Sequence, residues 1–69
     1  MQNKSNHISY VVITPARNEE KFIKKTIRSM VLQTIKPVKW IIVDDGSTDR
    51  TADIINKYAR MYAWIRLVR

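Results

Sequence analysis

The sequence has no cysteine and only one glycine, and each scarcity excludes a class of site. Without cysteine, neither a disulfide framework nor a thiolate metal site can form. The single glycine, Gly46, cannot supply the glycine-rich loops that cradle phosphates in P-loop proteins and dinucleotide-binding domains. The single histidine, His7, has no cysteine or second histidine with which to form a metal site or a catalytic triad, so we interpret it as structurally incidental.

Long apolar runs are missing as well. No segment approaches the roughly 18 apolar residues that a membrane-spanning helix needs, and residues 1–7 are polar rather than signal-like. We therefore expect a disordered leader over residues 1–7, followed by one domain over residues 8–69. The expected location is cytoplasmic, with contact to a membrane surface left open.

Acidic residues are scarce, six against thirteen lysines and arginines, which gives a formal net charge of +7. Such a balance suggests a phosphorylated ligand, an anionic membrane or RNA as a partner, although we do not expect nucleic acid. Helix N-termini favour acids through the helix dipole, which accounts for every acid except Asp44 and Asp45. The acids are Glu19, Glu20, Asp44, Asp45, Asp49 and Asp53.

Three short runs rich in β-branched and aromatic residues predict strands over residues 8–14, 40–43 and 64–68. The first run stops at Pro15, which cannot donate to a sheet ladder, so we expect the strand to end there. The second run stops at Asp44.

Between the strands, apolar residues recur at helical spacing. The first predicted helix is capped by Asn18, has Glu19 and Glu20 in its first turn and presents a basic outer face. Its expected buried residues are Phe22, Ile23, Ile27, Met30 and Val31. The second predicted helix starts at Thr48 or Asp49. Its expected buried residues are Ala52, Ile55, Tyr58, Ala59 and Tyr62.

This βαβαβ pattern predicts an α/β fold with a three-stranded parallel sheet, because parallel neighbours require a crossover. Right-handed crossovers place both helices on one face if the strand order is 3-2-1. The other face then has no cover, whereas parallel sheets are normally covered on both. We therefore expect part of a larger Rossmann-like domain, truncated at the third strand, or a second copy or partner that covers the open face.

The pair Asp44 and Asp45 has three interpretations. A carboxylate at a strand end can accept hydrogen bonds from a nucleobase edge or a ribose. Adjacent carboxylates can also bind Mg²⁺, which prefers oxygen ligands. Finally, one aspartate can simply cap the turn, with Gly46 supplying backbone freedom. The spacing alone leaves these three open.

Three segments in order resemble the start of a family 2 glycosyltransferase of the glycosyltransferase A fold: VVITPARNEE (11–20), SMVLQT (29–34) and WIIVDDGSTD (40–49). The resemblance covers roughly residues 8–68. It implies an enzyme that transfers a sugar from a nucleotide-diphosphate donor, of UDP or GDP type, to an acceptor, often with Mg²⁺ or Mn²⁺.

The resemblance also implies roles for individual residues. Pro15, Arg17 and Glu19 would line the nucleotide pocket, Asp45 would contact the base, and Asp44 would shape the turn. Arg17 departs from the family, which often carries an aromatic residue there, although arginine can still stack on a base or pair with a phosphate.

The metal-binding acidic motif and the catalytic base of the family are absent from these 69 residues. We therefore assign no catalytic residue and no metal ligand, and expect this chain alone to be inactive. A non-catalytic association module, or a basic surface for RNA or an anionic membrane, are the alternative interpretations.

Overall fold

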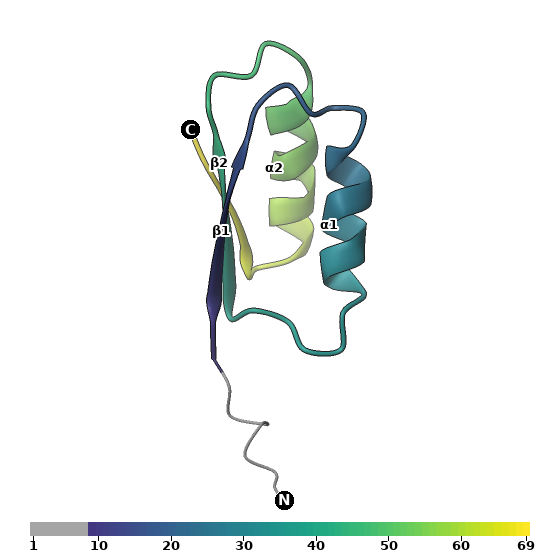
Figure 1. Ribbon diagram of the computed structural model, residues 1–69, viewed down its shortest axis with the longest axis vertical. Coiled ribbons are helices and arrows are strands. Elements are labelled where there is room, and N and C mark those ends of the chain that lie inside the picture. The colour runs from purple at the N-terminus through teal and green to yellow at the C-terminus, as the bar shows by residue number, and fades with distance from the viewer. Residues whose placement is uncertain (1–8) are drawn as a thin grey trace, which may run out of the picture.

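The computed structural model describes residues 9–69, which form a single sheet with two helices (Figure 1). Both β1 and β3 pair in parallel with β2, which gives the order β1-β2-β3. The predicted α/β class, parallel sheet and strand order are confirmed. The leader, His7 and the expected strand start at Ile8 lie outside the described residues. The elements are β1 (Val11–Ala16), α1 (Ile23–Val31), β2 (Lys39–Asp44), α2 (Thr51–Met61) and β3 (Ile65–Val68).

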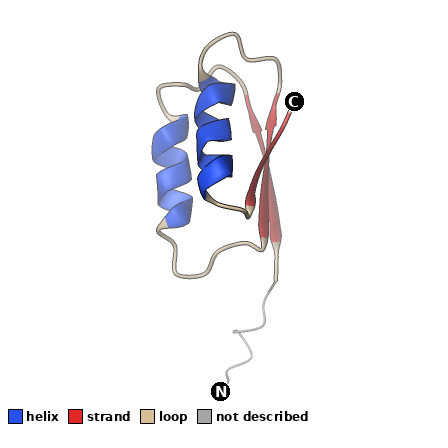
Figure 2. Ribbon diagram, turned by 180° about the vertical axis from the view of Figure 1, so that it is seen from behind, coloured by secondary structure: helices blue, strands red, loops and turns tan. Residues whose placement is uncertain are grey.

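Both helices lie on the same face of the sheet, as Figures 1 and 2 show from opposite sides. This arrangement follows from the strand order, because each strand-helix-strand unit crosses over in the same direction. Neither helix of residues 9–69 has the length and apolar character that crossing a bilayer requires.

The core lies between the sheet and the helices. Because side chains alternate along a strand, β2 turns Trp40 and Ile42 toward the helices, where they are 1% and 0% exposed. Ile27 of α1 and Ile55 of α2 are fully buried against them. The Trp40 indole N–H donates to the Thr14 hydroxyl at 2.9 Å, so its polar atom is satisfied inside the core.

The opposite face of the sheet is open, as predicted. Val11 and Ile13 of β1 remain 53% and 66% exposed, and Val68 of β3 is also exposed. Ile41 and Val43 of β2 are half-buried. The residues that form this open sheet face are Val11, Ile13, Pro15, Lys39, Ile41, Val43, Arg66 and Val68.

The prediction that Pro15 ends the first strand is wrong, because Pro15 lies inside β1 opposite Val43. The next carbonyl, that of Ala16, accepts the Asp45 N–H at 2.9 Å. Since successive residues of a strand direct their polar groups to opposite sides, the Pro15 nitrogen points away from β2. Its missing N–H therefore costs no ladder hydrogen bond, as is usual for proline on an edge strand.

The predicted helix starts are also wrong. α1 begins at Ile23 without a side-chain cap and has no acid in its first turn, so the dipole does not explain Glu19 and Glu20. Phe22, expected in the core, is exposed. α2 begins at Thr51, later than predicted, with Asp53 in its first turn as expected. Both helices begin later than predicted because residues of the two preceding loops, 17–22 and 45–50, hydrogen-bond to each other instead of extending the helices.

Candidate functional site

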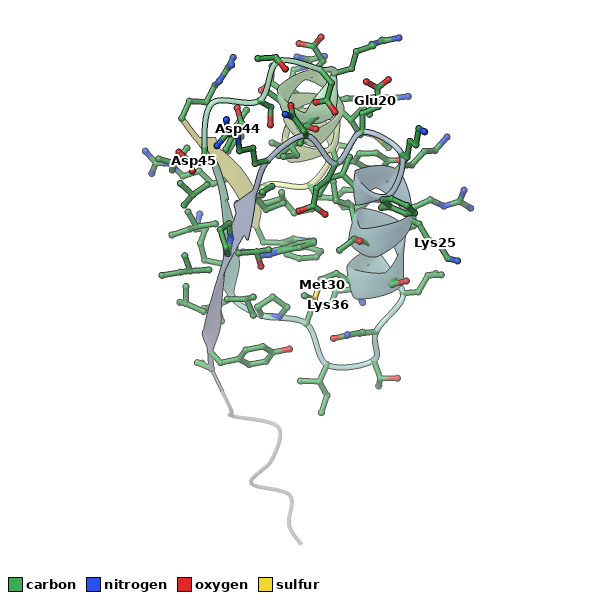
Figure 3. All side chains as sticks on the ribbon, turned by 45° about the horizontal axis from the view of Figure 1, so that its top comes forward. Glu20, Lys25, Met30, Lys36, Asp44 and Asp45 are labelled. Atoms are coloured by element: carbon green, nitrogen blue, oxygen red, sulfur yellow. The ribbon has the colours of Figure 1, made fainter. Side chains whose placement is uncertain are left out.

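The carboxyl ends of β1 and β2 meet at one edge of the sheet, and the loops over residues 17–22 and 45–50 leave from it (Figure 3). Ala16 is the register partner of Asp44, and its carbonyl accepts the Asp45 N–H. Pro15 and Arg17 flank Ala16 in the chain. The structure thus brings Pro15, Arg17, Asp44 and Asp45 to the same edge, where parallel α/β sheets bind ligands.

Asp44 is buried on the helix-covered side of β2. One carboxylate oxygen accepts a hydrogen bond from the Ser47 hydroxyl, which closes the turn around Gly46. Gly46 has a φ of 71°, a left-handed conformation that favours glycine. The other oxygen lies 3.4 Å from the Arg69 Nε but makes no hydrogen bond among the described residues. The Asp44 carboxylate therefore stabilises the turn after β2 through its hydrogen bond with Ser47.

Asp45 differs from its neighbour because its side chain is exposed while its backbone is fixed to β1. Pro15 and Arg17 are exposed too, so all three present side chains at the edge. Glu19 is half-buried, and its backbone takes part in the turn that leads into α1: its carbonyl accepts the N–H groups of Phe22 and Ile23 at 2.9 and 2.8 Å.

Asn18 joins the two loops instead of capping α1. Its N–H donates to the Ser47 hydroxyl at 2.9 Å, and its side-chain oxygen accepts the Thr48 N–H at 2.8 Å. Its φ of 50° is left-handed, a conformation that asparagine tolerates better than most residues. Because Ser47 also donates to Asp44, the turn after β2 is tied to the loop after β1.

A second set of hydrogen bonds joins the loops closer to the helices. The Glu19 N–H donates to the Thr51 hydroxyl at 2.7 Å, and Thr51 is fully buried. The Glu20 N–H donates to Asp49 at 3.2 Å, while the Glu20 carboxylate accepts the Arg50 N–H at 3.3 Å. Asn18, Ser47 and Thr51 were not among the predicted site residues. The signal that could have drawn attention to Ser47 and Thr51 was the run of polar residues that follows Gly46.

Asp49 is the ionisable group that this network perturbs. The hydrogen bond from the Thr51 hydroxyl is the largest influence and lowers the pKa of Asp49 below its usual range. Partial desolvation opposes this shift, and the backbone N–H groups of Thr51 and Glu20 add to it. The ionised Asp49 carboxylate therefore already accepts hydrogen bonds from Thr51 and Glu20 within the fold.

Within residues 9–69, no group of three or more histidine, aspartate or glutamate side chains is placed to hold a metal ion. Asp44 accepts a hydrogen bond from Ser47 and forms an ion pair with Arg69. Among the described residues, no third carboxylate joins Asp44 and Asp45 to complete a metal site. The described residues do not by themselves fit a divalent cation.

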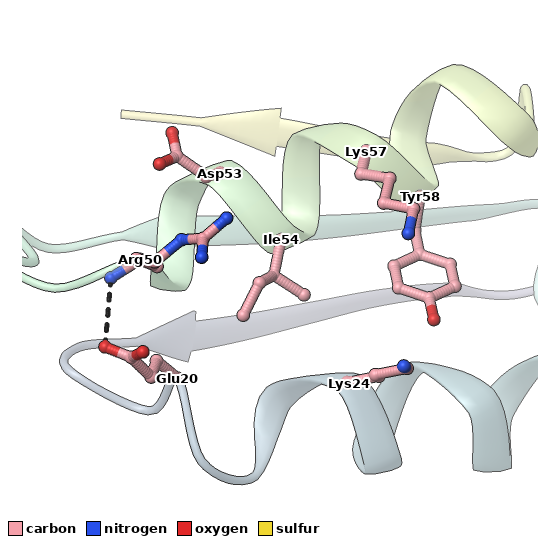
Figure 4. A pocket seen from close by; sticks show the side chains of 7 residues that line it. All are labelled: Glu20, Lys24, Arg50, Asp53, Ile54, Lys57 and Tyr58. Atoms are coloured by element: carbon pink, nitrogen blue, oxygen red, sulfur yellow. Dashed lines mark hydrogen bonds between the residues drawn. The ribbon is translucent and has the colours of Figure 1, made fainter.

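A small cavity of about 220 Å³ lies between the start of α1 and one side of α2 (Figure 4). It is smaller than the roughly 300 Å³ at which ligand pockets usually begin, and it contains none of the predicted nucleotide-binding residues. Across it, the Glu20 carboxylate accepts the Arg50 N–H. Its lining residues are Glu20, Lys24, Arg50, Asp53, Ile54, Lys57 and Tyr58.

Comparison with known proteins agrees with the observed fold. The family described as glycosyl transferase family 2 matches residues 11–69. A 4,4'-diaponeurosporenoate glycosyltransferase of Staphylococcus aureus (strain bovine RF122 / ET3-1) is 47% identical over 53 residues, and that of strain USA300 is 45% identical over 53 residues. The aligned part is 77% of this chain and 14% of each relative's length. The match spans all three strands and both helices, and the chain belongs to glycosyl transferase family 2.

Proposed function

We propose that this chain binds the nucleotide of a nucleotide-diphosphate sugar and belongs to an enzyme that transfers the sugar to an acceptor. The observation that carries the proposal is the position of Asp45: exposed, fixed through its backbone to β1, and at the carboxyl edge of a parallel sheet. Family membership supports a glycosyltransferase, and relatives in Staphylococcus aureus bear that name.

In this proposal the exposed side chains contact the donor. The Asp45 carboxylate accepts hydrogen bonds from the N–H edge of the base, which favours a base with such an edge, as in UDP or GDP. Arg17 stacks on the base or pairs with a phosphate, and Pro15 forms the apolar rim beside it. Glu19 contributes through its backbone, which holds the first loop on Thr51.

Asp44 acts on the donor indirectly. It holds the Ser47 hydroxyl, and Ser47 accepts the Asn18 N–H, so the turn that presents Asp45 is fixed before a ligand arrives. A fixed turn lowers the ordering cost of binding.

The chemistry of transfer needs more than these residues. Mg²⁺ or Mn²⁺ would offset the charge of the diphosphate leaving group, and the described residues offer no complete site for it. In this proposal the exposed carboxylate at this edge, that of Asp45, binds the base of the donor and does not act as a catalytic base. We therefore propose that this chain contributes donor binding rather than turnover.

The test is calorimetric titration of the chain with UDP, GDP and their sugar conjugates. Removing a charged hydrogen-bond acceptor costs about 1.5–3 kcal/mol, so Asp45→Ala should weaken nucleotide binding roughly 10- to 100-fold. Asp53→Ala removes the same charge from the exposed face of α2 and should leave affinity unchanged. Equal losses in the two variants, or no binding by a folded wild type, would contradict the role of Asp45.

A second candidate function is non-catalytic association through the open sheet face, favoured by the exposure of Val11 and Ile13. Sedimentation equilibrium of the wild type and of Ile13→Lys measures it. Association that the lysine abolishes would support this function, whereas a monomeric wild type at micromolar concentration would remove it.

A further inference from the structure

α1 turns a basic surface outward, away from the sheet. Ile23 and Ile27 face the core, and no acidic residue occurs between Ile23 and Val31. The outward side chains surround a shallow hollow of about 370 Å³. This α1 outer surface is formed by Lys21, Lys24, Lys25, Arg28, Ser29 and Leu32.

The cations of the α1 outer surface have no carboxylate partners within ion-pair distance. Among residues 9–69 the only ion pair joins Arg69 to Asp44, at the carboxyl edge of the sheet, and involves no residue of α1. Glu20 and Asp53 line the small cavity between the helices together with Lys24, and Glu20 already accepts the backbone N–H of Arg50. The remaining cations, Lys21, Lys25 and Arg28, therefore present an uncompensated positive charge to solvent.

Large apolar side chains accompany these cations. Leu32, directly after α1, is 81% exposed and lines the same hollow as the lysines. Phe22, directly before α1, is 64% exposed, and Ile35 in the following connection is 54% exposed. These three apolar residues flank α1 in the chain, while Ile23 and Ile27 of the helix itself face the core. A group of cations bordered by exposed apolar side chains favours the interface of an anionic membrane. A surface for RNA would instead interleave several aromatic rings with the cations, whereas Phe22 is the single aromatic residue of the segment 17–38.

We propose that the α1 outer surface docks this protein onto a bilayer that contains anionic phospholipid. Lys21, Lys25 and Arg28 contact the headgroup phosphates, and Leu32 and Phe22 enter the boundary between headgroups and acyl chains. The positive charge of this surface complements the negative charge of the headgroups, and the exposed apolar side chains add hydrophobic contact with the acyl chains. This inference does not depend on the nucleotide-binding role of Asp45.

The placement of α1 is compatible with access to the rest of the molecule. In Figure 1 α1 lies on one side, and the sheet, with its open face, lies on the other. Asp44 and Asp45 lie at the sheet side of the view in Figure 3, while Lys25 lies at the opposite side. A bilayer against α1 therefore leaves the carboxyl edge of the sheet and the open sheet face exposed.

The first experiment measures sedimentation with phosphatidylcholine vesicles that contain or lack phosphatidylserine. Wild type should bind only the anionic vesicles. Each cation near an anionic surface contributes a factor of roughly five, so Lys21→Gln with Lys25→Gln should weaken binding about 25-fold. Lys39→Gln with Arg66→Gln removes the same charge from the open sheet face and should change binding by less than about threefold, because screening by salt weakens the attraction on the side of the molecule opposite α1 (Figure 1). Equal losses in the two pairs, or no binding by wild type, would overturn the proposal.

The second experiment separates a bilayer from other polyanions. Leu32→Gln should weaken vesicle binding severalfold, because it removes the apolar contact, while Val11→Gln on the open sheet face should not. Both are exposed positions, and circular dichroism should show that both variants remain folded. If Leu32→Gln binds vesicles as wild type does, or if single-stranded RNA binds more tightly than the vesicles, the bilayer is the wrong partner.

Discussion

Both faces of the sheet contain isoleucine and valine, but the two faces differ in how far these side chains are exposed. On the covered face Ile42 is fully buried between the strands and helices, whereas Ile13 on the open sheet face is mostly exposed. The same alternation separates the two aspartates at the end of β2: Asp44 is buried and holds a turn, while Asp45 is exposed. Apolar content alone therefore predicts that a strand forms, but it does not predict which face of the strand the helices cover. The covered face is set by the side of the sheet on which the helices cross from one strand to the next.

The largest effect should come from truncating the same residue type on each face. Ile42→Ala removes a fully buried side chain and should cost about 2–5 kcal/mol in the free energy of unfolding. Ile13→Ala should cost less than about 1 kcal/mol, because that side chain is already exposed to water. Urea denaturation measures both. Losses of similar size would mean that the open sheet face is covered in solution.

A smaller effect should come from one buried hydroxyl. Thr51→Val keeps the side-chain shape but leaves the Glu19 N–H without its acceptor, at a cost of about 1–3 kcal/mol. The matched control is Thr26→Val on the exposed face of α1, which should change stability by about 0.5 kcal/mol or less. If urea denaturation gives the two variants the same stability, the hydrogen bonds between the loops do not stabilise the fold.

The smallest effect concerns pH and Asp49. Hydrogen bonds, chiefly from Thr51, lower the pKa of Asp49 in the folded state, so its ionised form stabilises the fold. That contribution is present above the usual pKa of 3.8 and is lost as the pH falls through the lower folded pKa. Asp49→Asn should therefore reduce stability near neutral pH and lessen its decline in acid. Asp53→Asn, at an exposed position, is the control, and an identical pH profile for both variants would contradict this role.

Much of the fold could be predicted from the sequence because local patterns encode it. Runs of β-branched residues marked the three strands, and helical spacing identified Ile23, Ile27, Ile55 and Tyr58 as buried. For the strand order 3-2-1, the shared face of the helices then followed from the general handedness of crossovers. The family, too, was predicted from motifs and is confirmed.

The site was predicted less completely, because its geometry depends on partners far apart in the chain. Asn18 looks like a helix cap from its neighbours, yet its side-chain oxygen accepts the N–H of Thr48, thirty residues away. Pro15 looks like the end of a strand, and only its edge position in the sheet makes it acceptable inside β1. The roles of Pro15, Arg17, Glu19, Asp44 and Asp45 toward a donor, the metal and the truncation of the domain stay predictions.

Pro15 also affects how copies of this protein could aggregate. An incoming strand that paired with the outer edge of β1 would find no N–H at Pro15, near the carboxyl end of that strand. Fibril-like stacking through this edge would therefore lose register where the ladder is interrupted. The unpaired edge of β3 has no such interruption over Ile65–Val68, so misassembly should begin there.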